Sequence, residues 1–442
     1  MSTATLPASA TLLRLATAGS VDDGKSTLVG RLLYDSKSVL ADQLDAVERV
    51  SRDRGLEGAD LALLTDGLRA EREQGITIDV AYRYFATARR SFILADCPGH
   101  VQYTRNTVTG ASTADVVVLL VDARRGLLEQ TRRHLAVASL LRVPHVVVAV
   151  NKIDLVGFAQ DRYDELAAQI RSAAADLGVP AIHTVPVSAL EGDNVVERSP
   201  RTPWYDGPSL LELLEDLPTA DDVETQPFRL PVQTVIRPQS AAPAGYEDYR
   251  GYAGQVAGGV VRVGDEVVVL PSGRRSTIEG IDTADGSLAE AYAPQSVTVR
   301  LSHDLDVARG DMIVAADDAP TPVQDVTGTV AWLSDRPLRP GARVLLKHTT
   351  RVVQAVVRDV VGRLDLDAAT LTPAEELGLN DIGRVQLRLA APVAAEEYVA
   401  SRRTGAFLLI DPQDGFTLAA GMVGDALAAA RFPGDRPVQY TI

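Results

Sequence analysis

The nine residues GSVDDGKST, 19–27, constrain the fold more than any other part of the sequence. Their first eight positions fit the pattern G-x-x-x-x-G-K-S, between an apolar run, LLRLATA (12–18), and a helical pattern, KSTLVGRLLYD (25–35). Glycines in such a turn let successive backbone N–H groups point at phosphate oxygens, and the start of a helix adds positive potential. We therefore expect a strand, a phosphate-binding loop and a helix, with the Lys25 ammonium on the β- and γ-phosphates and the Ser26 hydroxyl on Mg²⁺.

The lysine count supports a special role for Lys25. The chain has 44 basic residues, of which four are lysines and the remaining 40 are arginines. Two of the four lysines, Lys25 and Lys152, lie within motifs. A lysine is a compact point charge that fits where a guanidinium fork does not, so we interpret both as functional.

The first half of the chain alternates short apolar runs with helical patterns. Several runs are β-branched at consecutive positions, as expected of strands that are buried on both faces. This alternation predicts an α/β domain with a mainly parallel sheet. The predicted strands are 12–18, 91–96, 115–123, 145–151 and 183–190, and predicted helices include 130–142 and 163–178.

The pattern changes after an acidic segment with two prolines, 214–227, which we interpret as a linker. Short strand patterns separated by turn residues follow it, and a second break at 315–325 divides them. Regular spacing of this kind predicts two all-β barrels or sandwiches. We expect a nucleotide-binding α/β P-loop domain followed by two all-β barrel domains, with boundaries at 1–222, 223–320 and 321–442.

The motif NKID, 151–154, at the end of a predicted strand, indicates which base is bound. The Asp154 carboxylate can accept from guanine N1–H and the 2-amino group together, whereas adenine has no 2-amino group and presents a bare N1. Such a site discriminates on the order of 10⁴-fold, because the wrong base leaves a buried charge unpaired. We expect the Lys152 stem to cover the purine and Asn151 to tie this loop to the phosphate loop. The tripeptide SAL, 188–190, would offer a backbone N–H to guanine O6.

Two further segments concern hydrolysis. The motif DCPGH, 96–100, ends a predicted strand, so that Asp96 would hold Mg²⁺ through water and the Gly99 N–H would sense the γ-phosphate. Thr77, in EREQGITID, is a second candidate magnesium ligand. His100 could orient the attacking water, since phosphoryl transfer depends mainly on positioning and charge neutralisation.

These motifs together predict which residues form the site. The expected magnesium ligands are Ser26, Thr77 and Asp96, and the expected catalytic residue is His100. The residues expected to contact GTP are Gly19, Ser20, Val21, Asp22, Asp23, Gly24, Lys25, Ser26, Thr27, Asp96, Cys97, Pro98, Gly99, His100, Asn151, Lys152, Ile153, Asp154, Ser188, Ala189 and Leu190.

Composition excludes some classes of protein. A net charge of −15 argues against sequence-blind binding of a phosphate backbone, so we expect no nucleic-acid partner. No run of about 18 apolar residues is present, which argues against a membrane span. The single cysteine, Cys97, rules out an internal disulfide and fits a reducing cytoplasm, and we interpret it as a small apolar filler. No arginine finger can be assigned within the chain: Arg124 and Arg125, which follow a predicted strand, are candidates by position alone, and we expect solvated side chains there.

Taken together, DCPGH, REQGITI and an α/β domain followed by two β-barrels resemble the translational GTPases, such as elongation factor Tu. The chain is more closely similar to the large, GTP-hydrolysing subunits of bacterial sulfate adenylyltransferase. The segments that carry this resemblance cover nearly the whole chain: 19–27, 66–85, 106–112, 186–196, 250–267 and 401–411.

The resemblance implies a GTPase subunit that couples GTP hydrolysis to the formation of adenosine 5′-phosphosulfate by a small, ATP-pyrophosphatase-like catalytic subunit in a heterodimer. It also implies that Val21 and Ile76 form an apolar pair beside the water-positioning His100. No second G-x-x-x-x-G-K-[ST] is present, so we expect no fused adenylylsulfate kinase activity. The S-G-G-x-D-S pattern of ATP pyrophosphatases is also missing, so the adenylyl transfer would occur on another polypeptide. The alternative is a translation factor that binds tRNA or the ribosome.

Overall fold

The computed structural model describes residues 11–37, 61–64, 80–100, 104–179, 181–218, 225–238 and 247–426, together with Asp45, Val47, Arg49, Ser51 and Arg52. Thr77 and Ile76, the predicted magnesium ligand and apolar neighbour, lie outside these described residues. The chain divides into two compact units, one built mainly on residues 1–220 and the other mainly on residues 221–426.

The first unit is built on a six-stranded sheet. The strand order is β2-β3-β1-β4-β5-β6, and every neighbouring pair is parallel except β2 with β3. This confirms the mainly parallel α/β fold that the alternating pattern predicts. The strands are β1 (Thr11–Gly19), β2 (Ala81–Ala86), β3 (Arg90–Asp96), β4 (Val116–Asp122), β5 (His145–Asn151) and β6 (Ile182–Pro186).

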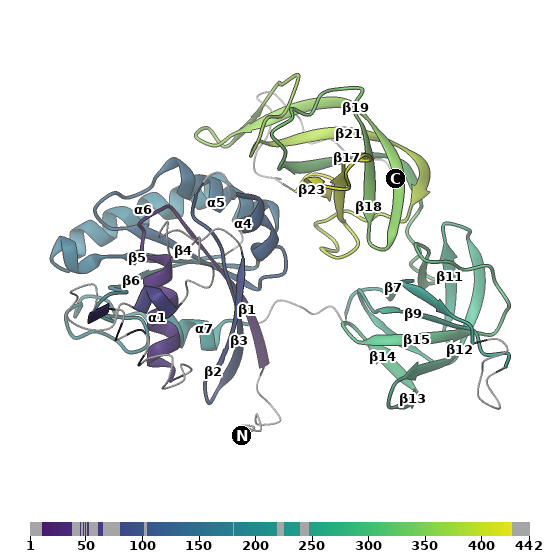
Figure 1. The fold of residues 1–442 in the computed structure, drawn as a ribbon, viewed down its shortest axis with the longest axis horizontal. Helices are drawn as coiled ribbons and strands as arrows, with labels where there is room; N and C mark the ends of the chain where they lie inside the picture. Colours follow the sequence, from purple (N-terminus) through teal and green to yellow (C-terminus); the bar gives the residue numbers. More distant parts are fainter. Residues whose placement is uncertain are drawn as a thin grey trace. The chain divides into compact units, whose positions relative to one another are not determined.

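Helices cover both faces of this sheet. Leucines of α1 and α7 pack in one cluster with alternate residues of β1, β3 and β4, while Figure 1 shows α4, α5 and α6 on the opposite face. Among the described residues, no helix combines the length and the apolar character that a membrane crossing requires. The helices are α1 (Lys25–Asp35), α4 (Thr104–Ala111), α5 (Glu129–Leu140), α6 (Gln160–Asp176) and α7 (Leu210–Asp216), with 3₁₀ turns η1 (Leu61–Leu64) and η3 (Ile153–Val156).

The parallel register brings the ends of four strands to one edge of the sheet. Thr17 in β1 pairs with Asp96 at the end of β3, and Asp122 at the end of β4 pairs with Asn151 at the end of β5. Loops that follow parallel strands therefore meet at this edge, which is where ligands bind in open α/β sheets.

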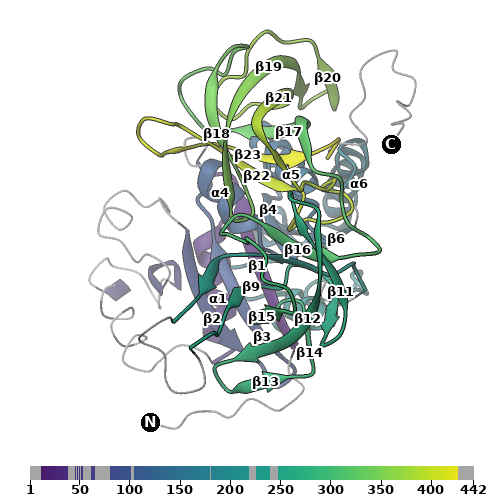
Figure 2. The same cartoon turned by 90° about the vertical axis from the view of Figure 1, so that its right-hand side faces the viewer.

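Among the described residues, the second unit has two large antiparallel sheets, of eight and seven strands, and a two-stranded antiparallel sheet of β10 and β14. Figure 2 shows this unit from the side. In the first, the order is β7-β16-β11-β12-β15-β9-β8, and a bridge between Arg229 and Gly258 returns β7 to the segment after β9. In the second, β18-β22-β23-β17-β21-β19 closes into a barrel through the pairing of β18 with β19. Along β19, buried and exposed residues alternate, as expected of a barrel wall.

The strands of the second unit are, in chain order, β7 (Arg229–Pro231), β8 (Thr234–Ile236), β9 (Gly251–Gln255), β10 (Val260–Arg262), β11 (Glu266–Leu270), β12 (Arg274–Thr283), β13 (Gly286–Leu288), β14 (Glu290–Tyr292), β15 (Ser296–Leu301), β16 (Met312–Ala315), β17 (Val323–Trp332), β18 (Arg343–His348), β19 (Arg351–Asp365), β20 (Thr370–Thr372), β21 (Ile382–Val393), β22 (Ala406–Ile410) and β23 (Thr417–Val423). An α/β domain followed by β-barrel structure confirms the predicted fold class.

Several predicted boundaries differ from the structure by a few residues, and two of the differences have a clear physical reason. The predicted strand 183–190 ends at Pro186, because the next residues form a tight turn in which Ser188 bridges Asp193. The predicted linker 214–227 begins later, because α7 continues to Asp216. That helix starts with a capping box, in which Ser209 accepts from the Glu212 backbone N–H and the Glu212 side chain accepts from the Ser209 N–H.

Candidate functional site

The loop between β1 and α1 is held by the side chain of Lys25. Its Nζ donates to the carbonyl oxygens of Gly19 at 2.9 Å and Ser20 at 3.0 Å, and the residue is only 7 % exposed. Burial lowers the pKa of Lys25, and the nearby carboxylates of Asp96 and Asp23 act in the opposite direction. The loop therefore encloses a buried cation, as expected of a phosphate-binding turn.

Two glycines allow the neighbouring segments to approach this loop. Gly24 has φ +91°, and a Cβ there would lie 2.4 Å from Asn151 Nδ2. A Cβ on Gly99 would lie 2.1 Å from Lys25 Nζ and 2.5 Å from the Gly19 carbonyl oxygen. Any other residue at either position would push apart the loop, the lysine or the segment after β3.

The Asp23 side chain stabilises the first half of the loop between β1 and α1. Its Oδ2 accepts from the Ser20 N–H at 2.8 Å, and both residues are buried. Burial raises the pKa of Asp23, although the Ser20 hydrogen bond and Lys25 favour the carboxylate. Within the described part of the chain, the buried Ser20 hydroxyl has no hydrogen-bond partner, so the loop keeps one polar group whose bonding capacity is unused.

The segment after β3 lies beside the loop. Asp96 is 1 % exposed, and its Oδ1 accepts from the Thr17 hydroxyl at 2.8 Å. Cys97 is fully buried, and burial raises the pKa of its thiol, which agrees with the apolar filler that we expect. The Pro98 carbonyl accepts from the Thr107 hydroxyl at 3.2 Å. His100 is half-buried.

The donors near the loop fit a magnesium ion. Ser26, in the first turn of α1, is half-buried, and Asp96 adds a carboxylate, so both donors are the hard oxygens that Mg²⁺ prefers. In the part of the chain that the structure describes, no cluster of three or more His, Cys, Asp or Glu side chains could hold a metal. A magnesium ion here would therefore need phosphate oxygens and water as its remaining ligands, which is its usual arrangement.

Asn151 connects three segments of the site. Its Nδ2 donates to the Asp23 carbonyl oxygen at 2.7 Å, and its Oδ1 accepts from the Ala189 N–H at 2.9 Å. The side chain is 2 % exposed. The predicted tie between the NKID loop and the phosphate loop is thus present in the structure, and it extends to the segment 188–190.

Lys152 is held by a carboxylate that the sequence analysis missed. Its Nζ lies 3.1 Å from Asp122 Oδ2 and donates to the Asp22 carbonyl oxygen, with the backbone in the left-handed region at φ +61°. Arg124 also binds Asp122, through Nε at 3.0 Å and Nη2 at 2.6 Å, so its guanidinium is not simply solvated. Burial would raise the pKa of Asp122, but these hydrogen bonds outweigh it and hold the pKa well below its usual range.

Asp154 lies in η3 and is half-buried. Within the described residues no donor makes a hydrogen bond to its carboxylate, although Arg124 is close enough to interact with it electrostatically. Its neighbour Ile153 is fully buried. A half-buried carboxylate with unused acceptor capacity, next to a held lysine, has the chemistry needed to accept two N–H groups from a base.

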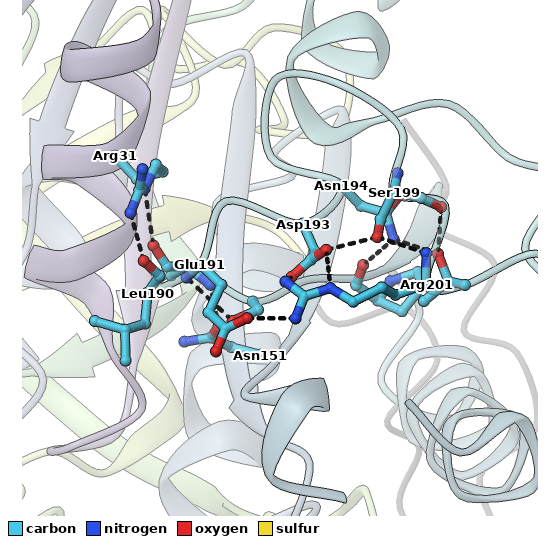
Figure 3. Close-up of polar contacts among 12 residues, drawn as sticks. Arg31, Asn151, Leu190, Glu191, Asp193, Asn194, Ser199 and Arg201 are labelled. Carbon is cyan, nitrogen blue, oxygen red and sulfur yellow. Dashed lines mark hydrogen bonds and ion pairs between the residues drawn. The ribbon is translucent and has the colours of Figure 1, made fainter. Parts of the chain in front are cut away.

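The segment 188–193 forms a tight turn (Figure 3). The Ser188 N–H donates to the Asp193 carbonyl oxygen at 3.1 Å, and the Gly192 N–H donates to the Ser188 carbonyl oxygen at 2.7 Å. Arg201 binds the Asp193 carboxylate on one side of this turn, with Nε 2.9 Å from Oδ1. Leu190 is 70 % exposed at its tip.

The structure thus brings together the loop 19–24, the segment 96–100, the NKID loop and the turn 188–190. Of the remaining loop residues, Val21 is half-buried and Asp22 is exposed with φ +68°. Thr27 is half-buried on α1. The sequence signal for Asp122 is weak: it ends a predicted strand and is followed by basic residues, but its contact with Lys152 depends on the pairing of β4 with β5.

A buried histidine behind the site gives a pH-dependent prediction. His134 in α5 is 2 % exposed, its Nδ1 has no partner among the described residues, and burial together with the charges of Lys25 and Arg133 lowers its pKa to about 3. Because the pKa of His134 in the folded state lies below its ordinary value, the unfolded state binds a proton first. The free energy of unfolding therefore decreases as the pH falls below about 6.5. His134→Gln should remove this loss, so between pH 7 and 5 its free energy of unfolding should rise relative to wild type by on the order of 2 kcal/mol. Urea titrations at both pH values measure the difference, and parallel pH profiles would contradict it.

Comparisons with known proteins agree with this geometry. Residues 10–220 match the model of the elongation factor Tu GTP binding domain, and residues 325–424 match the GTP-eEF1A C-terminal domain-like model. A bifunctional enzyme CysN/CysC of Mycobacterium tuberculosis is 54 % identical over 97 % of this chain and 70 % of its own length.

Two further relatives have the same name as each other, sulfate adenylyltransferase subunit 1. The sulfate adenylyltransferase subunit 1 of Teredinibacter turnerae is 49 % identical over 95 % of this chain and 88 % of its own length. That of Cellvibrio japonicus is 47 % identical over 97 % of this chain and 89 % of its own length. These matches span both compact units of the chain.

Proposed function

The chain belongs to the sulfate adenylyltransferase subunit 1 family, with an elongation factor Tu-type GTP-binding domain, and we propose that it is the GTP-hydrolysing subunit of a sulfate adenylyltransferase. In this role, GTP hydrolysis drives the formation of adenosine 5′-phosphosulfate and pyrophosphate from ATP and sulfate on a partner subunit. The product contains a mixed anhydride that hydrolyses readily. Its synthesis therefore runs uphill and needs a second source of free energy.

One observation supports this proposal most strongly. The phosphate loop, the segment 96–100, the NKID loop and the turn 188–193 meet at one edge of the sheet, and Asn151 hydrogen-bonds to two of them. Such an edge can hold a phosphate chain at one end and a base at the other.

At the phosphate end, the Lys25 ammonium would move from the loop carbonyls onto the β- and γ-phosphates, while backbone N–H groups of the loop and of Gly99 contact their oxygens. Ser26, Thr77 and Asp96 would hold magnesium, whose charge neutralises the phosphate oxygens during transfer. His100 would orient the attacking water between the side chains of Val21 and Ile76. Departure of the γ-phosphate would then release the segments that contact it.

At the base end, the Asp154 carboxylate would accept from guanine N1–H and the 2-amino group. The Lys152 stem would cover the purine, because Asp122 and the Asp22 carbonyl hold its ammonium at the phosphate loop. The turn 188–190 would offer its N–H groups to O6. The other residues expected to contact GTP would contribute backbone and packing to these contacts.

The partner that we propose is a small, ATP-pyrophosphatase-like subunit that carries the adenylyl transfer. The domain boundaries 1–222, 223–320 and 321–442 are part of the same proposal. The translation-factor alternative is less supported, because the relatives compared above carry sulfate adenylyltransferase names.

Reconstitution tests the coupling. The chain alone should hydrolyse GTP slowly and make no adenylylsulfate, and addition of the small subunit with ATP and sulfate should raise GTP turnover and yield adenylylsulfate. GTP turnover that is identical with and without ATP and sulfate would contradict the proposal.

Within this assay, His100→Ala should lower GTP hydrolysis about 10²-fold or more while GTP affinity changes little, because the imidazole orients water rather than binding the nucleotide. His183→Ala is the matched control, since His183 lies near the amino end of β6, at the opposite edge of the sheet from the site. An unchanged hydrolysis rate in His100→Ala would exclude this role.

A further inference from the structure

Arg31 links the phosphate-binding helix to the turn at the base end of the site. It lies in α1, six residues after Lys25, and its side chain is 20 % exposed. Its Nε donates to the Ala189 carbonyl oxygen at 3.2 Å, and its Nη2 donates to the Leu190 carbonyl oxygen (Figure 3). A single guanidinium group therefore hydrogen-bonds to two consecutive backbone carbonyls of the turn.

These contacts fix the direction of the N–H groups in the turn. The Ala189 carbonyl and the Leu190 N–H belong to one planar trans peptide and point to opposite sides of it. The peptide before it is held by Asn151, whose Oδ1 accepts from the Ala189 N–H, and the Glu191 N–H donates to the Ser188 hydroxyl at 3.3 Å. Among the described residues, the Leu190 N–H has no hydrogen-bond partner, so Arg31 sets the orientation of the donor that the turn keeps available.

The other contact of Arg31 is a weaker one. Its Nη1 lies 3.6 Å from Asp35 Oδ1, one helical turn along α1, and partly exposed pairs of this kind contribute little stability. Hydrogen bonds from a charged donor to two backbone carbonyls are stronger and directional. The main consequence of Arg31 is therefore the geometry of the turn, while Arg201 anchors the Asp193 end of the turn independently.

We propose that Arg31 is a positioning residue for guanine specificity: by holding the Ala189 carbonyl, it orients the N–H group of Leu190 toward O6 of the base. This inference rests on the proposed function, because it assigns the turn to the base end of a guanine nucleotide site. It makes base recognition depend on a side chain of the same helix whose first turn would bind the phosphates.

Calorimetric titrations with three diphosphates separate this role from general support of the fold. GDP and inosine diphosphate both carry O6, whereas 6-thioguanosine diphosphate keeps N1–H and the 2-amino group but presents sulfur, a weak acceptor. Arg31→Ala should raise the Kd of GDP and of inosine diphosphate about tenfold, and that of the thio analogue less than threefold. The ratio of GDP to inosine diphosphate affinity, which reports Asp154, should stay constant.

Three further measurements complete the test. Arg31→Lys keeps a charged donor and should restore part of the lost affinity, and it takes the place of Arg31→Ala if that variant fails to fold. Asp35→Asn removes the charge of the ion pair at a residue that makes no hydrogen bond to the turn among the described residues, and it should leave all three affinities unchanged. In GTP hydrolysis, Arg31→Ala should raise KM with kcat little changed.

Equal losses for all three diphosphates, or no loss for any, would overturn the role of Arg31. Failure of the wild-type chain to bind GDP would instead overturn the proposed function, and that result is distinct because it needs no variant.

Discussion

Lys25→Ala should reduce the affinity for GDP and GTP by about 10²- to 10³-fold, because two charge-assisted contacts to phosphate oxygens are lost together. Lys25→Arg should be tolerated poorly as well. The lysine is 7 % exposed, and its Nζ lies against the loop carbonyls and the backbone of Gly99, where a guanidinium fork has no room. Calorimetry with GDP and Mg²⁺ measures both effects.

The matched control is Lys347→Ala. Lys347 lies in β18 of the second unit and is half-buried. Lys347→Ala therefore removes one positive charge, as Lys25→Ala does, but from a residue far in sequence from every residue predicted to contact the nucleotide. It should bind GDP as wild type does. Thermal unfolding of Lys25→Ala without nucleotide separates lost binding from lost structure, and affinity within threefold of wild type would contradict the assignment of the phosphate loop.

Asp154→Asn should change the preferred nucleotide from GTP to xanthosine triphosphate. The amide donates to the 2-oxo group of xanthine, whereas it cannot accept from both N1–H and the 2-amino group of guanine. The affinity for GTP should fall by roughly 10²- to 10⁴-fold, since the discrimination depends on a charged acceptor with two donors. Competition between the two triphosphates in a hydrolysis assay measures the preference.

Asp161→Asn is the control for this change. Asp161 is an exposed carboxylate in the first turn of α6, seven residues beyond Asp154, and its conversion to an amide should leave the preference for GTP intact. An Asp154→Asn variant that still prefers GTP would mean that the base lies elsewhere.

Local patterns were sufficient to predict most of the first unit. The helix 25–35 and the strand 145–151 agree with α1 and β5 residue by residue, because a glycine-rich turn before a helix and a β-branched run each limit the backbone strongly. The end of the strand predicted over 183–190 was wrong. The apolar pattern continues past Pro186, but the hydrogen bonds of the turn at Ser188 outweigh strand propensity.

The supporting contacts were harder to predict because they join distant parts of the chain. Arg31 contacts carbonyls 158 and 159 residues away, and in sequence it is an ordinary arginine in an amphipathic helix. Asp122 likewise gains its importance only when β4 and β5 pair and bring Lys152 beside it. A motif identifies the residues that would touch a ligand, whereas the side chains that hold those residues depend on tertiary packing.

The central claim is that this edge of the sheet binds a guanine nucleotide. Titration of the wild-type chain with GDP and with ADP, each with Mg²⁺, tests it most directly. We predict tight binding of GDP and affinity for ADP weaker by about 10⁴-fold, because adenine leaves the Asp154 carboxylate unpaired. Equal affinity for the two diphosphates, or a preference for ADP, would contradict the account.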